Sequence, residues 1–219
     1  SIVADDTISL PSYITGLWLR NTGITTVGNE VTVWEDLAGN GDLTVPTNKA
    51  KTSPIWNGNG PVDFSPRLTD CLAGDTISDI TVGNQGGCTI HIDLELTTID
   101  EMFWGSSTSI FTARTNGVDV RMSSFTPITS PTIITDGVRR VFTVVWEGVE
   151  GTPAKVYIDG VLDLNTTQSG MVLYPGFLHF LGGNYNIAAL GTDLKVHNYA
   201  LADKPCSEAE IAETLGLFL

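Results

Sequence analysis

The sequence has little charge, and very little of that charge is positive. Only 16% of the 219 residues are charged, and 11 Lys and Arg residues stand against 25 Asp and Glu residues, for a formal net charge of −14. Nucleic acids and anionic membrane surfaces bind through clustered basic side chains, and Arg139-Arg140 is the only adjacent basic pair. We therefore predict that neither is a partner. Hydrophobic residues make up 42% of the chain, which excludes intrinsic disorder and is enough to fill a core.

Long apolar runs are also missing. No stretch approaches the ~18 apolar residues that a membrane-spanning helix needs, so we predict no membrane insertion. Residues 1–10 lack a basic region followed by an apolar stretch and are not an intact signal peptide. A chain that begins at Ser1 is typical of a protein that has lost only its initiator Met, and we take this as favouring a phage structural protein released by lysis.

Cysteine is scarce. Three residues, Cys71, Cys88 and Cys206, allow at most one internal disulfide. A domain of this length folds without disulfides, and we predict that all three are small buried apolar side chains. Whether Cys71 and Cys88 pair depends on geometry that the sequence does not give. No Cys-x-x-Cys occurs and the three His residues are scattered, so the spacing of a zinc site is missing.

Short β-strand patterns separated by turns fill the chain. Residues 89–96 (TIHIDLEL) alternate strictly between apolar and polar, as a half-buried strand does. Residues 140–146 (RVFTVVW) are β-branched and aromatic, which also favours a strand. Asp159-Gly160 lies between two strand-like pieces and predicts a type I′ hairpin. The residues from 207 to 215 (SEAEIAETL) break the pattern, because Ser207 and Glu210 form a capping box and predict one short closing helix.

Several phrases occur in a fixed order along most of the chain, from about residue 17 to residue 215. They are 17–19 (LWL), 31–41 (VTVWEDLAGNG), 63–65 (DFS) with 69–72 (TDCL), 140–146 (RVFTVVW), 156–162 (VYIDGVL), 181–184 (LGGN), 194–201 (LKVHNYAL) and the closing helix.

This order of phrases resembles the laminin G-like domains of the concanavalin A-like lectin and glucanase superfamily. The match at 156–162 is close, whereas 63–72 has Ser65 in place of the usual Gly, and 140–146 lacks the family's Trp-His pair. The resemblance implies an all-β, two-sheet antiparallel jelly-roll sandwich with one short C-terminal helix. We expect residues 1–16 to form an N-terminal arm or lead-in strand and residues 17–219 to form the jelly-roll domain. This architecture serves lectins, adhesion modules, hydrolases and structural units, so the site needs a separate argument.

Glycoside hydrolysis needs two carboxylates across the scissile bond. Jelly-roll hydrolases that resemble laminarinases carry Glu-x-Asp-x-(x)-Glu on one strand, and the nearest sequence here is 91–95 (HIDLE), with a His in the nucleophile position. Asp93 and Glu95 lie on one face, about 7 Å apart along the backbone. We predict that this is a solvated strand face, with a sugar or metal contact by His91, Asp93 and Glu95 as the alternative. Catalysis is the least favoured hypothesis, and no catalytic residue is assigned.

No cofactor is predicted. His, Asp and Glu at alternate positions of one strand can chelate a cation, and calcium occurs in relatives of this fold. However, no loop in the sequence repeats Asp or Asn at alternate positions before a closing Glu, so calcium has no support.

Aromatic side chains in loops are the usual platforms for sugars. Trp18, Trp34 and Trp146 lie in strand patterns and are expected in the core. Trp56 and Trp104 each stand beside a turn, and Tyr185 stands between two Asn residues, one of which is Asn184. We take Trp56, Trp104, Tyr185 and Asn184 as candidate ligand-binding residues, with packing against the core as the alternative.

Together these features predict a non-enzymatic surface-recognition module, carbohydrate-binding or adhesive, on a cell exterior or virion surface. Its partner is then a glycan or another host-surface component, with other virion proteins or further copies of the chain as additional candidates. The alternative is a phage structural protein, a capsid decoration or fibre-tip domain, with no sugar ligand. A polysaccharide hydrolase or lyase is less favoured because His91 replaces the nucleophile.

Overall fold

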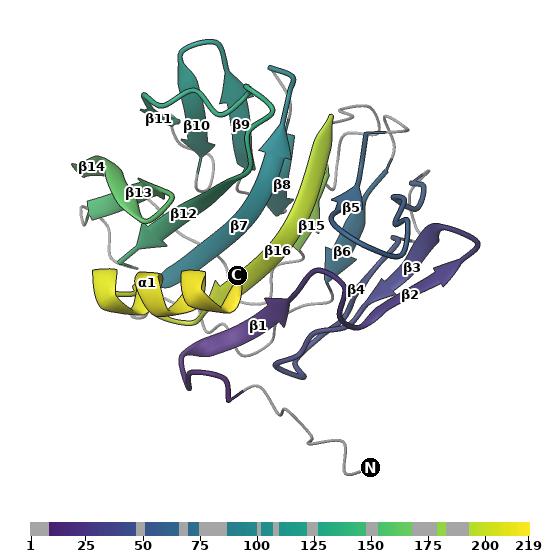
Figure 1. Cartoon of the computed structure of the whole chain (residues 1–219). Helices are drawn as coiled ribbons and strands as arrows, with labels where there is room; N and C mark the ends of the chain where they lie inside the picture. Colours follow the sequence, from purple (N-terminus) through teal and green to yellow (C-terminus); the bar gives the residue numbers. More distant parts are fainter. Residues whose placement is uncertain are drawn as a thin grey trace.

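The computed structural model describes residues 9–46, 51–65, 70–74, 87–99, 102–106, 110–121, 127–147, 153–167, 179–182 and 193–219. Over these residues the chain forms two antiparallel β-sheets packed face to face, with one helix, α1 (Glu208–Leu217), against one of them (Figure 1). The predicted all-β, two-sheet jelly-roll sandwich with a short C-terminal helix is therefore confirmed. Within the described residues, no helix is long and apolar enough to cross a membrane.

The first sheet has seven described strands in the order β1-β16-β7-β12-β13-β14, with β5 paired to β16. The predicted strands at 89–96 and 140–146 are β7 and β12, and they pair with Ile92 opposite Phe142. The domain boundary expected at residue 17 falls inside β1, which pairs with β16 from Ile14 onward. The strands are β1 (Ile14–Trp18), β16 (Leu194–Ala202), β7 (Cys88–Leu96), β12 (Arg140–Trp146), β13 (Pro153–Ile158), β14 (Val161–Thr167) and β5 (Val62–Asp63).

The second sheet has nine described strands in the order β11-β10-β9-β8-β15-β6-β4-β3-β2. Several are only two or three residues long, and they form the opposite layer of the sandwich (Figure 1). Their bounds are β11 (Ile128–Ser130), β10 (Gly117–Arg121), β9 (Ile110–Arg114), β8 (Met102–Ser106), β15 (His179–Leu181), β6 (Leu72–Gly74), β4 (Leu43–Thr44), β3 (Glu30–Trp34) and β2 (Ile24–Val27).

Large apolar side chains fill the space between the sheets. Trp18, Trp34 and Trp146 are buried there, as predicted. The expectation that Trp104 lies beside a turn on the surface is wrong, because Trp104 belongs to β8 and is fully buried. Its Nε1 donates a hydrogen bond to the hydroxyl of Tyr199 over 2.8 Å. The main core is therefore rich in Trp, and no sugar platform is available at Trp104.

The turn at residues 36–41 is organised around one carboxylate. Asp36 is 4% exposed, and its Oδ1 accepts from the backbone N–H groups of Leu17 and Ala38 at 2.8 and 2.9 Å. Its Oδ2 accepts from the N–H groups of Asn40 and Gly41 at 2.9 and 3.1 Å. Four main-chain donors thus converge on Asp36, and the 31–41 phrase ties β1 to the turn after β3.

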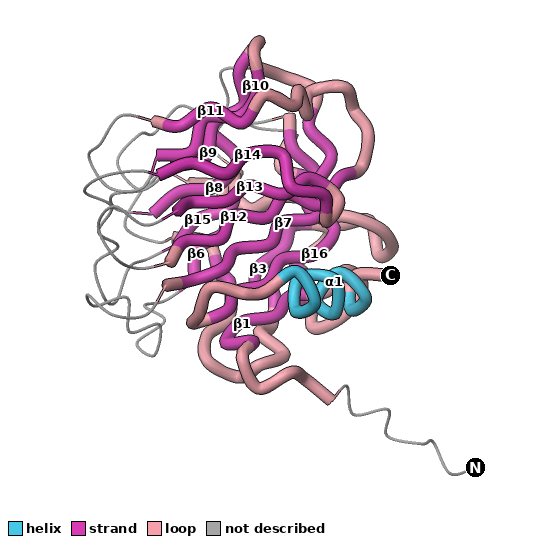
Figure 2. Tube along the Cα trace, turned by 90° about the vertical axis from the view of Figure 1, so that its left-hand side faces the viewer, coloured by secondary structure: helices cyan, strands magenta, loops and turns pink. Residues whose placement is uncertain are grey.

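Helix α1 covers part of the outer face of the seven-stranded sheet, as Figures 1 and 2 show. Ile211 of the helix and Phe218 just beyond it belong to one buried cluster with Val145 of β12 and Tyr157 of β13. Cys206, just before the helix, joins the same second core, and all three cysteines are buried free thiols, which confirms the predicted burial. Burial raises the pKa of the Cys71 and Cys88 thiols to about 12.

The predicted capping box at the start of α1 is present. The Ser207 side chain accepts from the Glu210 N–H, and the Glu210 carboxylate accepts from the Ser207 N–H at 2.8 Å. We expect Ser207→Ala to lower the free energy of unfolding by about 1 kcal/mol, because the cap satisfies a helix N–H that has no other partner. Urea unfolding measures this, and Ser207→Gly is the control, since Gly at this position costs only a few tenths of a kcal/mol. Equal losses in both variants would contradict the capping role.

Candidate functional site

The outer face of β7 is covered, and this corrects the prediction of a solvated strand face. His91 and Asp93 are both 0% exposed, as is Thr89. The side chain of Thr89 accepts from the N–H of Cys206 at 2.8 Å and donates to the carbonyl of Lys204 at 2.9 Å. The polar side of β7 therefore anchors the segment that leads into α1, and it faces protein rather than water.

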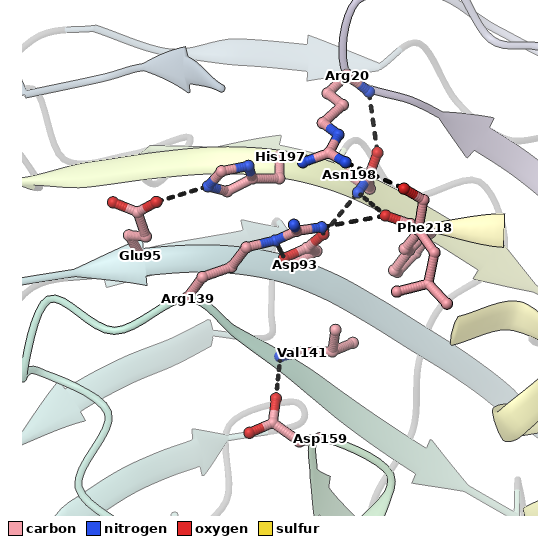
Figure 3. Close-up of polar contacts among 10 residues, drawn as sticks. Arg20, Asp93, Glu95, Arg139, Val141, Asp159, His197, Asn198 and Phe218 are labelled. Carbon is pink, nitrogen blue, oxygen red and sulfur yellow. Dashed lines mark hydrogen bonds and ion pairs between the residues drawn. The ribbon is translucent and has the colours of Figure 1, made fainter. Parts of the chain in front are cut away.

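A bulge in β16 brings two further polar side chains to this face. Val196 pairs with Leu94 and Asn198 pairs with Asp93, so His197 is the extra residue between them. An extra residue changes which side chains share a face, and here His197 and Asn198 both point outward, toward β7 (Figure 3). The strand sequence alone, read with a period of two, assigns these neighbours to opposite faces.

Asp93 is the centre of a buried polar cluster. Arg139 donates to both of its carboxylate oxygens, from Nε at 2.8 Å and from Nη2 at 2.6 Å, and Asn198 Nδ2 donates to Oδ2 at 2.5 Å (Figure 3). The hydrogen bonds to Asp93 raise the pKa of Arg139 above its ordinary value. Arg139 Nη2 and Asn198 Nδ2 also donate to the carbonyl of Phe218, at 3.1 and 3.2 Å. The cluster therefore holds the segment after α1 on the sheet.

Arg20 extends this cluster from the end of β1. Its N–H donates to the Asn198 Oδ1 at 2.9 Å, and its Nη2 donates to the carbonyl oxygen of Leu219 at 3.1 Å (Figure 3). The Leu219 side chain itself is 95% exposed. Main-chain atoms, not side chains, are what Arg20, Arg139 and Asn198 recognise in this segment.

Glu95 lies at the edge of the covered area. Its Oε1 is 2.8 Å from Nε2 of His197, and its Oε2 is 3.7 Å from Nζ of Lys195. The Glu95 side chain is 27% exposed, whereas that of His197 is 8% exposed. Asp93 is thus paired with Arg139, and Glu95 with His197 and Lys195. The two carboxylates do not face each other across an open site.

His91 lies under the segment that follows α1. Its Nδ1 is 3.0 Å from the Thr143 hydroxyl, and its ring meets the Phe218 ring edge-on, with centroids 6.5 Å apart. Burial disfavours the charged imidazole and lowers the pKa of His91 to about 3.

This burial predicts a loss of stability in mild acid. The unfolded chain takes up a proton at His91 near its ordinary pKa of 6.5, whereas the folded chain does so only near 3. The folded state is therefore not penalised by His91 at pH values above the pKa of the unfolded chain. Its stability declines as the pH falls from that pKa towards the lower pKa of the folded chain. We expect this group to cost about 2 kcal/mol of unfolding free energy between about pH 7 and about pH 5. Urea unfolding at several pH values measures the slope, which His91→Gln should reduce; an unchanged slope contradicts this account.

An open pocket of about 200 Å³ lies next to the Asp93 cluster. It is bounded by the start of β12, the turn between β13 and β14, and the end of α1. Arg140 and Asp159 give it a polar rim, with Nη1 and Oδ2 3.7 Å apart. The lining residues are Asp93, Arg139, Arg140, Val141, Asp159, Leu215, Phe218 and Leu219.

The predicted ligand-binding residues do not all meet at this place. His91, Asp93 and Glu95 share one face of β7, but only Asp93 lines the pocket. Trp56 is half-buried and packs against the main core, in a segment where Ile55 bridges to Glu30 and Asp63. Asn184 and Tyr185 lie outside the described residues. Trp56 stays a candidate, while no ligand role is supported for Trp104.

Sequence reasoning missed most of the pocket and cluster, namely Arg139, Arg140, Asp159, His197 and Asn198. The Arg139-Arg140 pair was visible as the only adjacent basic pair, and Asp159 was assigned only as a turn residue. Among the described residues, no group of three or more His, Cys, Asp or Glu side chains is placed to hold a metal ion.

These features define a jelly-roll β-sandwich whose outer face carries a pocket beside the closing helix. No protein-family model matches the sequence, and no curated protein matches it.

Solved structures do resemble it in fold. The sialidase of Trypanosoma rangeli superposes with a TM-score of 0.62 at 12% identity, covering 92% of this chain and 32% of the sialidase. The binding domain of Paraclostridial mosquitocidal protein 1 gives 0.63 at 12% identity, covering 91% of this chain and 51% of that one. The receptor-binding domain of botulinum neurotoxin D gives 0.60 at 10% identity, covering 92% and 52%. The chain thus spans about a third of the sialidase and about half of each toxin domain, and at these identities the likeness concerns the fold.

Proposed function

We propose that this chain is a non-enzymatic recognition module of the laminin G-like type that binds carbohydrate on the exterior of a cell or virion. The observation that carries the proposal is the fold shared, over at least 90% of this chain, with toxin domains that are named for binding and receptor binding. A β-sandwich of this kind offers rigid strands and variable loops, on which a recognition site can be placed without disturbing the core.

The state of the two carboxylates supports binding over hydrolysis. A glycosidase needs one carboxylic acid and one carboxylate that both reach the scissile bond. Asp93 is 0% exposed, and both of its oxygens accept hydrogen bonds from Arg139. Glu95 accepts from His197 instead. A completely buried carboxylate that an arginine holds through both oxygens is not presented to a substrate, which counts against the hydrolase alternative.

The test is a glycan array probed with the purified chain, once with calcium and once with a chelator. Binding to a defined class of sugar in both conditions supports a calcium-independent module. Binding that disappears with the chelator supports the module but requires a metal site. A blank array in both conditions overturns carbohydrate recognition and leaves the structural virion protein as the function to test, by binding to capsid lattices.

A further inference from the structure

We propose that the pocket between the β13–β14 turn and the end of α1 is the sugar-binding site, and that it takes one uncharged sugar ring. This inference rests on the proposed carbohydrate-binding function and adds the place and the ligand class. Three properties of the pocket support it: a polar rim with unused hydrogen-bonding capacity, a fixed geometry and an apolar wall.

The polar rim has both donor and acceptor capacity. Arg140 Nη1 and Asp159 Oδ2 are 3.7 Å apart, which is beyond hydrogen-bond distance. Oδ1 of Asp159 accepts from the Val141 N–H, and no described residue lies within hydrogen-bond distance of its Oδ2. Adjacent hydroxyls of a sugar match this rim, because one can donate to Oδ2 of Asp159 while its neighbour accepts from Arg140.

The rim is held in place before any ligand arrives. The Val141 N–H donates to Oδ1 of Asp159 at 2.7 Å, and the Asp159 N–H donates to the carbonyl of Val141 at 2.8 Å. Figure 3 shows the contact between the Val141 N–H and Asp159. Arg140 Nη2 donates to Asp136 at 2.5 Å. Asp159 and Gly160 both have positive φ, 51° and 78°, as the predicted type I′ turn requires. Side chains that are already ordered lose little conformational entropy on binding.

An apolar wall faces this rim. Val141 and Leu215 line the pocket, and the buried ring of Phe218 closes it behind them. The turn lies close to the helix, since a Cβ added at Gly160 would lie 3.3 Å from Cδ2 of Leu215. The C–H face of a sugar packs on such an apolar surface while its hydroxyls face the rim. A volume of about 200 Å³ admits a single ring.

Charge favours an uncharged ligand. Arg139 is neutralised by Asp93, and Arg140 lies between Asp136 and Asp159. The C-terminal end of α1 adds partial negative charge at the same place, and the whole chain carries a formal net charge of −14. Among the residues that line the pocket, both arginines already face carboxylates, so the pocket disfavours a carboxylated or sulfated sugar.

The experiment uses one array of neutral, sialylated and sulfated glycans, with the wild type and four variants applied at a series of concentrations. Asp159→Asn keeps an oxygen for the Val141 N–H and keeps an Asn-Gly turn, but it replaces the free acceptor with a donor. Arg140→Met keeps an unbranched apolar stem and removes the guanidinium. The matched controls are Arg114→Met and Asp119→Asn, from an ion pair on β9 and β10 that is also partly exposed.

We expect the wild type to bind neutral glycans, with apparent affinity reduced at least tenfold in Asp159→Asn and Arg140→Met and changed less than twofold in the two controls. Thermal unfolding checks that all four variants are folded. Neutral-glycan binding that survives both pocket variants overturns the site while the proposed function stands. Preference for sialylated or sulfated glycans overturns the ligand class in the same way. A blank array for the wild type overturns the proposed function, and this inference with it.

Discussion

Asp36→Ala is expected to lower the free energy of unfolding by about 4 kcal/mol, the largest effect predicted here for a single polar side chain. The carboxylate of Asp36 accepts from four backbone N–H groups, and the Asp36 side chain is itself buried, at 4% exposure. Alanine leaves those donors without their acceptor, and hydrogen bonds to a charged group are the strong ones. Urea unfolding, followed by tryptophan fluorescence, measures the loss.

Two companion variants separate the turn from a general effect of charge. Asp36→Asn keeps one acceptor oxygen but points an NH₂ group at two N–H donors, so it should also be destabilising, though less than Asp36→Ala. Asp203→Ala removes an equally negative but exposed residue and should change the unfolding free energy by less than about 0.5 kcal/mol. If Asp36→Ala and Asp203→Ala cost the same, the four hydrogen bonds do not stabilise the turn.

Local patterns in the sequence predicted most of the first sheet correctly. The alternation in residues 89–96 placed Ile90, Ile92, Leu94 and Leu96 on one face of β7, and all four lie in the main core. The Asp159-Gly160 turn and the Ser207 capping box are present as predicted. These predictions are correct because each feature depends on backbone geometry within a few residues. Side-chain periodicity and turn residues indicate that geometry directly.

The other face of β7 could not be predicted from the same alternation. A polar face next to an apolar one indicates water on that side, but here the second partner is α1, more than a hundred residues later in the chain. Thr89 binds main-chain atoms of the segment that leads into α1. Asp93 holds the side chains of Arg139 and Asn198, which in turn donate to the carbonyl of Phe218. Alternation shows which residues share a face; it does not show what covers the face.

The candidate pocket was beyond sequence reasoning for a similar reason. Arg140 and Asp159 meet only because β12 and β13 pair side by side, and the wall comes from the end of α1. The bulge at His197 is a single extra residue in a nine-residue strand and has no composition signal, since no Gly or Pro marks it. Trp104 was misplaced because the Gly105 that follows it was taken as the start of a turn, whereas Gly105 lies in β8 and pairs with Phe180 of β15.

The ion pair between Asp93 and Arg139 leads to the second large prediction. Asp93 is completely buried and Arg139 is 34% exposed, so the two residues are not equivalent. Arg139→Met is expected to lower the free energy of unfolding by about 3 kcal/mol, because it leaves a buried carboxylate without its cation. The value lies at the lower end for broken buried pairs because Arg139 itself is partly in water.

A double-mutant cycle tests whether the buried charge, rather than the lost packing of Arg139, causes that cost. Adding Asp93→Asn to Arg139→Met removes the unpaired charge, so the double variant should recover about half of the loss, whereas independent sites would add. Lys195→Met is the control, because its pair with Glu95 is long and exposed, and it should cost less than about 1 kcal/mol. Strict additivity in the cycle would mean that Asp93 is not charged in the folded chain or that water reaches it. Recovery in the double variant, together with faster amide exchange at residues 215–219, would show instead that the pair both neutralises Asp93 and fixes the segment that forms the pocket wall.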